Sequence, residues 1–189
     1  MPESRPPIDL QGVSIAELER LIAAERLPPV HKWDPAPCGH SRMRIDREGR
    51  WFHEGRPIER ESMVRLFSTI LRREPDGSHV LVTPVEKMTI DVERTPFFVT
   101  SMTSEGTGER RQIAFALRGG EVVILGADHP LLVPAEEPDR SPRLLVRGGL
   151  EAILARPVYY ELAQIAVDEG NDPPGVWSNG SFFPLDRPT

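Results

Sequence analysis

Residues 44–57 read RIDREGRWFHEGRP, and residues 144–157, which lie 100 positions later, read LLVRGGLEAILARP. Each stretch passes through a turn glycine, Gly49 or Gly149, and ends on Arg-Pro, a pair that is typical of the opening of a helix. When the comparison is extended to residue 84, seven of 41 aligned pairs are identical, whereas ordinary composition gives about three. We therefore predict a duplicated unit of hairpin, helix and strands.

The chain before the first repeat carries its own helix signal. Residues 14–17 read Ser-Ile-Ala-Glu, which has the spacing of a capping box, and apolar residues follow at helical spacing until the prolines at 28 and 29. We expect an α+β protein with two structurally related halves, each a small antiparallel sheet with one main helix. The predicted divisions are an N-terminal helix and arm at 1–40, a first repeat domain at 41–100 and a second at 101–189.

The composition is that of a folded globular protein, because 39% of the residues are hydrophobic and 28% are charged. The single cysteine, Cys38, excludes an intrachain disulfide. No apolar stretch approaches the roughly 20 residues that cross a membrane, and the first seven residues lack the apolar core of a signal peptide. We expect a cytoplasmic protein with no membrane association.

The charge distribution disfavours nucleic-acid binding. The chain has a net charge of −6, and only the segment 41–75 is net positive, with glutamates between its basic residues. A local anion site is compatible with this balance, since a few arginines hold a phosphate bidentately whatever the global charge.

A set of short motifs lies between Met43 and Val99: Arg44-Ile45-Asp46, Gly49-Arg50-Trp51, the run from Gly55 to Arg60, Val64-Arg65-Leu66-Phe67, Asp76-Gly77 and the run from Thr83 to Lys87. Through these motifs the sequence resembles a bacterial domain-of-unknown-function family, DUF1285. The resemblance implies two related α+β halves, of which the second is superficially like a pleckstrin-homology fold. It also implies a nucleotide-like ligand at the interface between the halves and a role in signal transduction. The family pattern leads us to expect an aromatic residue at position 79, where this chain has His79.

Two helix openings are the first candidates for ligand binding. Arg56-Pro57 and Arg156-Pro157 are expected to leave free amides at helix N-termini, where an anion is favoured. Arg56, Arg60 and Arg156 are suited to hold a phosphate, and His53 projects from the preceding strand. If the duplication brings the two helix openings together, these residues meet at the interface between the halves.

Further candidates lie in three short segments. Thr83, Glu86 and Lys87 follow a strand end, and Lys87 is one of two lysines among 23 basic residues. Tyr159 lies in the helix that is predicted to open at Arg156-Pro157. Trp177 and Ser178 lie in a predicted turn, where an indole and a hydroxyl are suited to stack a flat base and to bond its edge.

The sequence predicts neither a catalytic residue set nor a metal site, and it names no cofactor. His31, Cys38 and His40 are the nearest approach to a metal cluster, but they lack a recognisable ligand spacing. We expect a regulatory or signal-transduction protein that binds a small nucleotide-like or phosphate-bearing molecule between its halves. One alternative is an enzyme that uses His53, Glu86 or Lys87 for proton transfer on a nucleotide-like metabolite. The other is a protein-interaction module that recruits a partner through its sheet edges or through the apolar stripe at 15–22.

Overall fold

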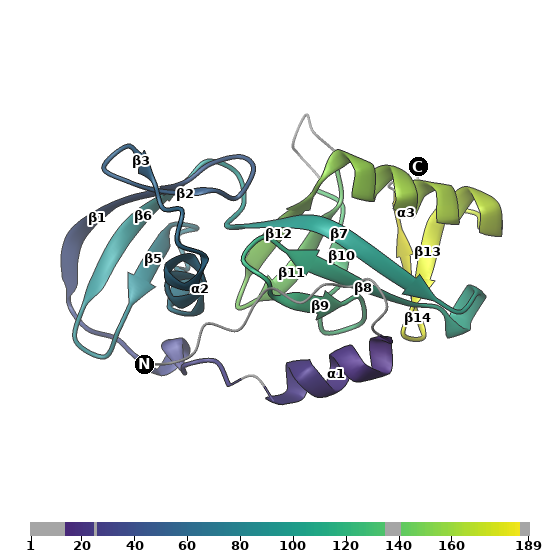
Figure 1. The fold of residues 1–189 in the computed structure, drawn as a ribbon, viewed down its shortest axis with the longest axis horizontal. Coiled ribbons are helices and arrows are strands. Elements are labelled where there is room, and N and C mark those ends of the chain that lie inside the picture. The colour runs from purple at the N-terminus through teal and green to yellow at the C-terminus, as the bar shows by residue number, and fades with distance from the viewer. Residues whose placement is uncertain (1–13, 25, 135–140, 186–189) are drawn as a thin grey trace.

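The computed structural model describes residues 14–24, 26–134 and 141–185, and it contains two sheet-based halves that lie side by side (Figure 1). The chain begins with helix α1 (Ile15–Ala24) and a short 3-10 helix, η1 (Val30–Lys32), which precede both sheets. None of the helices among the described residues has the length and hydropathy of a membrane span.

The first half is a six-stranded sheet with one helix. Its strands have the order β3-β2-β1-β6-β5-β4, and they are β1 (Pro37–Ile45), β2 (Trp51–His53), β3 (Arg56–Pro57), β4 (Leu71–Arg73), β5 (His79–Val82) and β6 (Lys87–Val92). Helix α2 (Glu61–Thr69) lies in the chain between β3 and β4. All neighbouring strands are antiparallel except the central pair, β1 and β6, which is parallel.

The second half repeats this sheet and adds a helix and a hairpin after it. Its strands have the order β10-β11-β12-β7-β8-β9, and they are β7 (Phe97–Glu105), β8 (Gln112–Leu117), β9 (Val122–Ile124), β10 (Leu131–Leu132), β11 (Arg143–Arg147) and β12 (Leu150–Leu154). The 3-10 helix η2 (Gly108–Arg110) joins β7 to β8. Helix α3 (Arg156–Glu169) then leads to a separate hairpin of β13 (Gly175–Ser178) and β14 (Ser181–Pro184). The central pair, β7 and β12, is again parallel.

The two predicted related halves are confirmed, because the sheets have the same strand order when β7 is matched with β1 and β12 with β6. This match corresponds to a shift of about 60 residues along the chain and differs from the shift of 100 seen in the sequence. The shift of 100 instead matches β1, β2, α2, β4 and β5 with β11, β12, α3, β13 and β14. Each of these sets is a hairpin, a helix and a second hairpin. The two matches differ because β4 and β5 join the main sheet of the first half, whereas β13 and β14 pair only with each other.

Three details of the predicted organisation are corrected by the strand pairing. The first sheet begins at Pro37 and the second at Phe97, so the predicted division after residue 100 cuts through β7. Each sheet is mixed, because the first and last strands of each half lie side by side in parallel. Pro57 lies in β3 and does not open a helix, since Arg56 pairs with His53, whereas Pro157 does occupy the first turn of α3.

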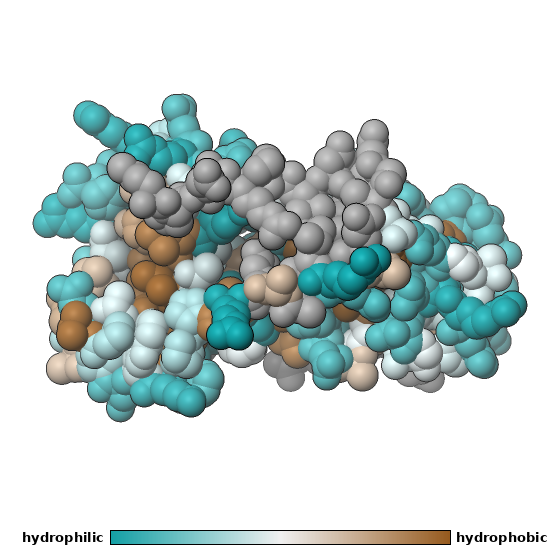
Figure 2. All heavy atoms as spheres, turned by 60° about the horizontal axis from the view of Figure 1, so that its bottom comes forward, coloured by the Kyte–Doolittle hydropathy of each residue, from teal (hydrophilic) through white to brown (hydrophobic). Residues whose placement is uncertain are grey.

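The main hydrophobic core extends through both halves. It joins Ile45, Trp51 and Leu71 of the first half to Phe97 and Phe115 of the second, among others. In the view of Figure 2 the first half also carries apolar side chains on its surface. Among the described residues, far fewer buried apolar side chains lie between Ile45 and Ile90 than between Phe97 and Leu185, so the first half has the smaller core.

Helix α1 precedes the first half in the chain but packs on the second. Ile15 is fully buried and forms a separate cluster with Ala114, Ala116 and Val122, on β8 and β9. Its backbone amide donates a hydrogen bond of 3.0 Å to Oε1 of Glu105, at the end of β7. The first residue of the predicted apolar stripe is therefore covered by the chain itself, and most of that stripe lies outside the side chains that the structure describes.

Candidate functional site

Four arginines join the two halves by donating hydrogen bonds to backbone carbonyls of the opposite half. They are Arg65 to Gly119 at 3.1 Å, Arg73 to Gly149 at 3.2 Å, Arg118 to Glu48 at 2.8 Å and Arg147 to Ser68 at 2.9 Å. Two of these side chains come from each half, so the contact is reciprocal. Charged donors form stronger hydrogen bonds than neutral ones, and the halves are therefore held together by more than their shared core.

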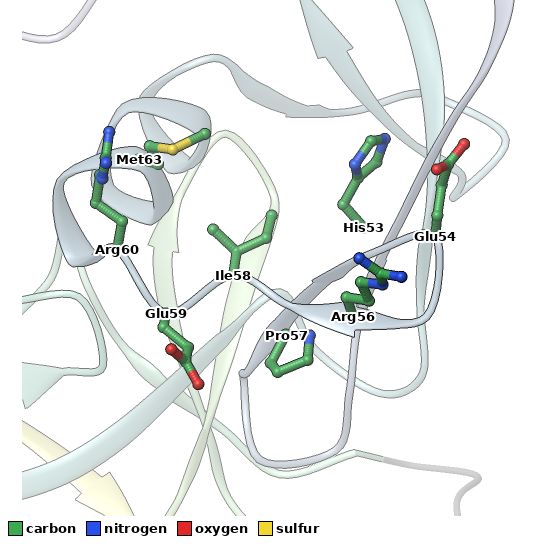
Figure 3. Close-up of a pocket in the computed structure, with 8 residues that line it drawn as sticks. All are labelled: His53, Glu54, Arg56, Pro57, Ile58, Glu59, Arg60 and Met63. Atoms are coloured by element: carbon green, nitrogen blue, oxygen red, sulfur yellow. The ribbon is translucent and has the colours of Figure 1, made fainter.

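One cavity, with a volume of about 700 Å³ in the first half, brings three predicted site residues together (Figure 3). His53 and Arg56 are direct partners in the pairing of β2 with β3, so their side chains lie on the same face of this hairpin. Arg60 immediately precedes α2 on the other side of the cavity. All the residues that line this cavity belong to the first half, so the three do not meet at the interface.

Another cavity, of about 460 Å³, does lie between the halves. The arm at residues 27–31 forms one wall, the first half supplies residues 69 and 71–73, and the second half supplies Arg147, Gly148 and Leu150. Arg72 holds the arm in place, because its guanidinium donates to the carbonyls of Val30 at 3.0 Å and Trp33 at 2.5 Å. None of the predicted site residues lines this cavity.

Arg73 belongs to a small charged group at this interface. Its guanidinium lies 3.8 Å from the carboxylate of Glu151, and it is the direct partner of His79 in the pairing of β4 with β5. Burial lowers the pKa of His79 and the charge of Arg73 lowers it further, while Glu151 partly opposes both effects. The histidine that replaces the expected aromatic residue is therefore held toward its neutral form.

Arg156 and Tyr159 come together in the second half, apart from the other candidates. They line a cavity of about 430 Å³ at the start of α3, together with Arg94 and Tyr160. The rings of Tyr159 and Tyr160 are 6.2 Å apart and tilted by 53°. The two predicted helix openings therefore border separate cavities and do not share one.

The segment with Thr83, Glu86 and Lys87 has structural contacts. The Thr83 hydroxyl accepts a hydrogen bond of 3.0 Å from the Glu86 amide and so stabilises the turn between β5 and β6. Only 14% of the Lys87 side chain is exposed, and its ammonium lies 3.3 Å from Asp34 and 3.9 Å from Glu74. Lys87 thus fastens the N-terminal arm to the first sheet.

Trp177 and Ser178 lie in strand β13, and the predicted turn begins one residue later, at Asn179. Ser178 is fully buried, and its hydroxyl accepts a hydrogen bond of 3.0 Å from Ile113. The same hydroxyl donates one of 2.7 Å to the carbonyl of Leu125. The Ser178 hydroxyl thus holds β13 against the second sheet, and ligand recognition by this residue stays a prediction.

Sequence reasoning missed the arginines of the interface. Arg147 is matched with Arg47 in the repeat, and that identity was the available signal, but nothing local indicates which backbone carbonyl its side chain will reach. The side chains of His31, Cys38 and His40 form no common site. In the part of the chain that the structure describes, no three His, Cys, Asp or Glu side chains are grouped so as to hold a metal ion.

Comparison with known proteins identifies the chain through both halves. Residues 28–95 match the family model for the N-terminal domain of DUF1285, a domain of unknown function, and residues 96–185 match the model for its C-terminal domain. No curated protein matches the sequence.

Two crystal structures of family members match the fold. One, from Silicibacter pomeroyi DSS-3, is 39% identical, has a TM-score of 0.76, and the match covers 91% of this chain and 94% of that one. Another, from Shewanella baltica OS155, is 23% identical with a TM-score of 0.52, and the match covers 68% of this chain and 96% of that one. The likeness to the second supports the fold alone. With both of its halves matched in order, the chain belongs to the DUF1285 family, whose function is unknown.

Proposed function

We propose that the protein is a cytoplasmic regulatory protein that binds a small nucleotide-like or phosphate-bearing molecule in the cavity between its halves. The observation that supports this proposal is that the arm and both halves supply walls of the same cavity. A ligand bound there contacts three parts of the chain at once. Its binding free energy then depends on how those parts are arranged, which is the physical requirement for a ligand that regulates.

The chemistry of the cavity suits a flat molecule with an acidic group. Its volume of about 460 Å³ lies within the range of small-molecule sites, roughly 300–1,000 Å³. Leu27, which is 45% exposed, and the prolines at 28 and 29 provide apolar surface for a ring. Arg73 is 42% exposed, and its contacts within the protein are long, so its guanidinium can take a closer anionic partner.

The enzyme alternative has less support. That hypothesis requires His53, Glu86 or Lys87 to share a cleft, but His53 lines the 700 Å³ cavity of the first half, while Lys87 lines a different cavity beside Asp76. Glu86 lies in an exposed turn next to Lys87. We therefore retain ligand binding without turnover as the proposed function.

The test is the melting temperature of the purified protein against a panel of nucleotides, dinucleotides, cyclic nucleotides and phosphorylated metabolites. A ligand at 100 times its dissociation constant stabilises a protein by about 2.7 kcal/mol, which is a shift of a few degrees at this size. We expect a selective shift in the wild-type protein that Arg73→Ala abolishes.

Arg118→Ala is the matched control, because Arg118 also donates a hydrogen bond across the interface but does not line the cavity. This variant should lose similar intrinsic stability and keep the ligand-induced shift. If no compound shifts the wild-type protein, or if both variants lose the shift equally, the proposed site is wrong.

A further inference from the structure

Two of the side chains that line the 700 Å³ cavity of the first half are arginines without a carboxylate partner among the described residues. Arg56 and Arg60 line this cavity, and no described residue forms an ion pair with either guanidinium. Many other arginines of the chain are engaged, for example Arg50 with Asp46 at 2.7 Å and Arg111 with Glu169 at 2.9 Å. Arg56 and Arg60 therefore both bring positive charge to this cavity without a carboxylate partner among the described residues.

The backbone on both sides of the cavity fixes the spacing of these side chains. Glu54 and Gly55 have φ values of 48° and 79°, so they form a tight turn that sets His53 directly opposite Arg56. On the other side, the carbonyl of Arg60 accepts hydrogen bonds from Met63 at 3.0 Å and Val64 at 3.2 Å. The charged groups are therefore mounted on a hairpin and on the start of a helix, and ordering them on binding costs little backbone entropy.

Two carboxylates also border the cavity, and neither forms an ion pair with Arg56 or Arg60. Glu54 is paired with Arg42 at 2.7 Å, and the hydrogen bond and charge of Arg42 lower the pKa of this carboxyl, with a smaller effect from His53. Glu59 points away from His53 and Arg56, as Figure 3 shows. Three basic side chains thus line the cavity, His53 and Arg56 on the hairpin and Arg60 at the start of α2, with Ile58 and Met63 as its apolar part.

We infer that this cavity is a second ligand site, separate from the one between the halves, and that it takes the phosphate or pyrophosphate group of a small molecule through Arg56, Arg60 and His53. Guanidinium groups bind phosphate oxygens bidentately, and two of them lining one cavity match a polyanion better than a single-charge carboxylate. The cavity is open and mainly polar, so it selects for charge and accepts varied groups beyond the phosphate.

Isothermal titration with pyrophosphate, at low ionic strength and pH 7, tests this inference. We expect saturable binding that Arg56→Ala and Arg60→Ala each weaken at least tenfold, while Arg56→Lys keeps part of the affinity. Arg110→Ala is the matched control, because it removes the same charge from an exposed position in η2 of the other half. Equal weakening by Arg110→Ala, or no saturable binding in the wild-type protein, would overturn the inference.

Two further variants sharpen the result and separate it from the proposed function. Glu54→Gln should strengthen pyrophosphate binding about two- to fivefold, because it removes a carboxylate beside His53, whereas Glu59→Gln should leave it unchanged. Arg118→Ala, whose side chain lines neither cavity, should also leave pyrophosphate binding unchanged. If Arg73→Ala abolishes it while Arg56→Ala does not, pyrophosphate binds between the halves and the second site is refuted.

Discussion

The two halves have the same strand order, but their helices are used differently. Helix α3 buries Val158, Leu162 and Ala166, whereas α2 has no fully buried residue. Leu66 of α2 is 61% exposed, while Leu162 of α3 is completely covered. Most buried apolar residues of the protein also lie in the second half.

The two halves therefore share a topology but do not contribute equally to the stability of the protein. The second half has the deeper core and is expected to supply most of the free energy of folding, because that free energy follows buried apolar area. The stability of the first half depends on its contacts with the second, which are the shared core and the four arginine hydrogen bonds to backbone carbonyls. Because its helix α2 is not buried, the first half has room at its surface for the open 700 Å³ cavity, which is lined by basic side chains.

The largest expected effect comes from truncating one leucine in each helix. Leu162→Ala should lower the free energy of unfolding by about 3 kcal/mol, because it leaves a cavity in a closed core. Leu66→Ala should cost less than about 0.5 kcal/mol, since the side chain is mostly in water already. Urea unfolding of both variants measures the difference, and equal losses would show that the two helices are energetically equivalent after all.

An intermediate effect is expected at the turn where the first half meets the second. Gly49 has φ +73°, and a Cβ added there would lie 2.7 Å from Cβ of Phe98. Gly49→Ala should therefore cost about 2–3 kcal/mol, from backbone strain and the clash together.

Gly55→Ala provides the matched comparison for this turn. Gly55 has φ +79° but no atom within 4 Å of an added Cβ, so the substitution should cost only about 1 kcal/mol. Thermal unfolding of the two variants isolates the cost of the contact between the halves. Equal melting temperatures would mean that the turn of Gly49 can move away from Phe98 freely.

The smallest effect is a pH dependence at the interface. The pKa of His79 is lowered from 6.5, so at neutral pH this group is uncharged in both the folded and the unfolded chain. As the pH falls below about 6.5, the unfolded chain binds the proton first, and stability decreases until the folded protein also binds it. The slope from this single proton is at most about 1.4 kcal/mol per pH unit.

His79→Gln removes this group without adding a charge. Denaturant unfolding between pH 7.5 and 5 should show a flatter profile for the variant than for the wild-type protein. Arg73→Ala should also flatten the profile in part, because the charge of Arg73 is one cause of the lowered pKa. Superimposable wild-type and His79→Gln profiles would contradict a role for His79 at the boundary between the halves.

Features that depend on neighbouring residues could be predicted from the sequence. The turns at Gly49 and Gly149 have φ values of +73° and +77°, which glycine alone adopts easily, and a local pattern is enough to find them. The opening of α3 at Arg156-Pro157 was also predicted, since proline fits the first turn of a helix.

Features that depend on distant residues could not be predicted. Arg56-Pro57 has the same local signal as Arg156-Pro157, but pairing with β2 draws it into a strand. The parallel pairing of β7 with β12, the burial of Ser178 and the ion pair of Lys87 with Asp34 all join segments about 50 residues apart. For the same reason the predicted site residues were distributed over several cavities, while the walls of the interface cavity were missed.

The docking of α1 on the second half also has a consequence for biosynthesis. Ile15 leaves the ribosome about 100 residues before Ala114, Ala116 and Val122, which cover it. A helix of ten residues is marginal in water, so this segment has no stable partner while the first half is being made. Closing so distant a contact is a late step in folding. Substitutions in α1 should therefore affect the packing of β8 and β9, late in folding, and not the half that follows α1 in the chain.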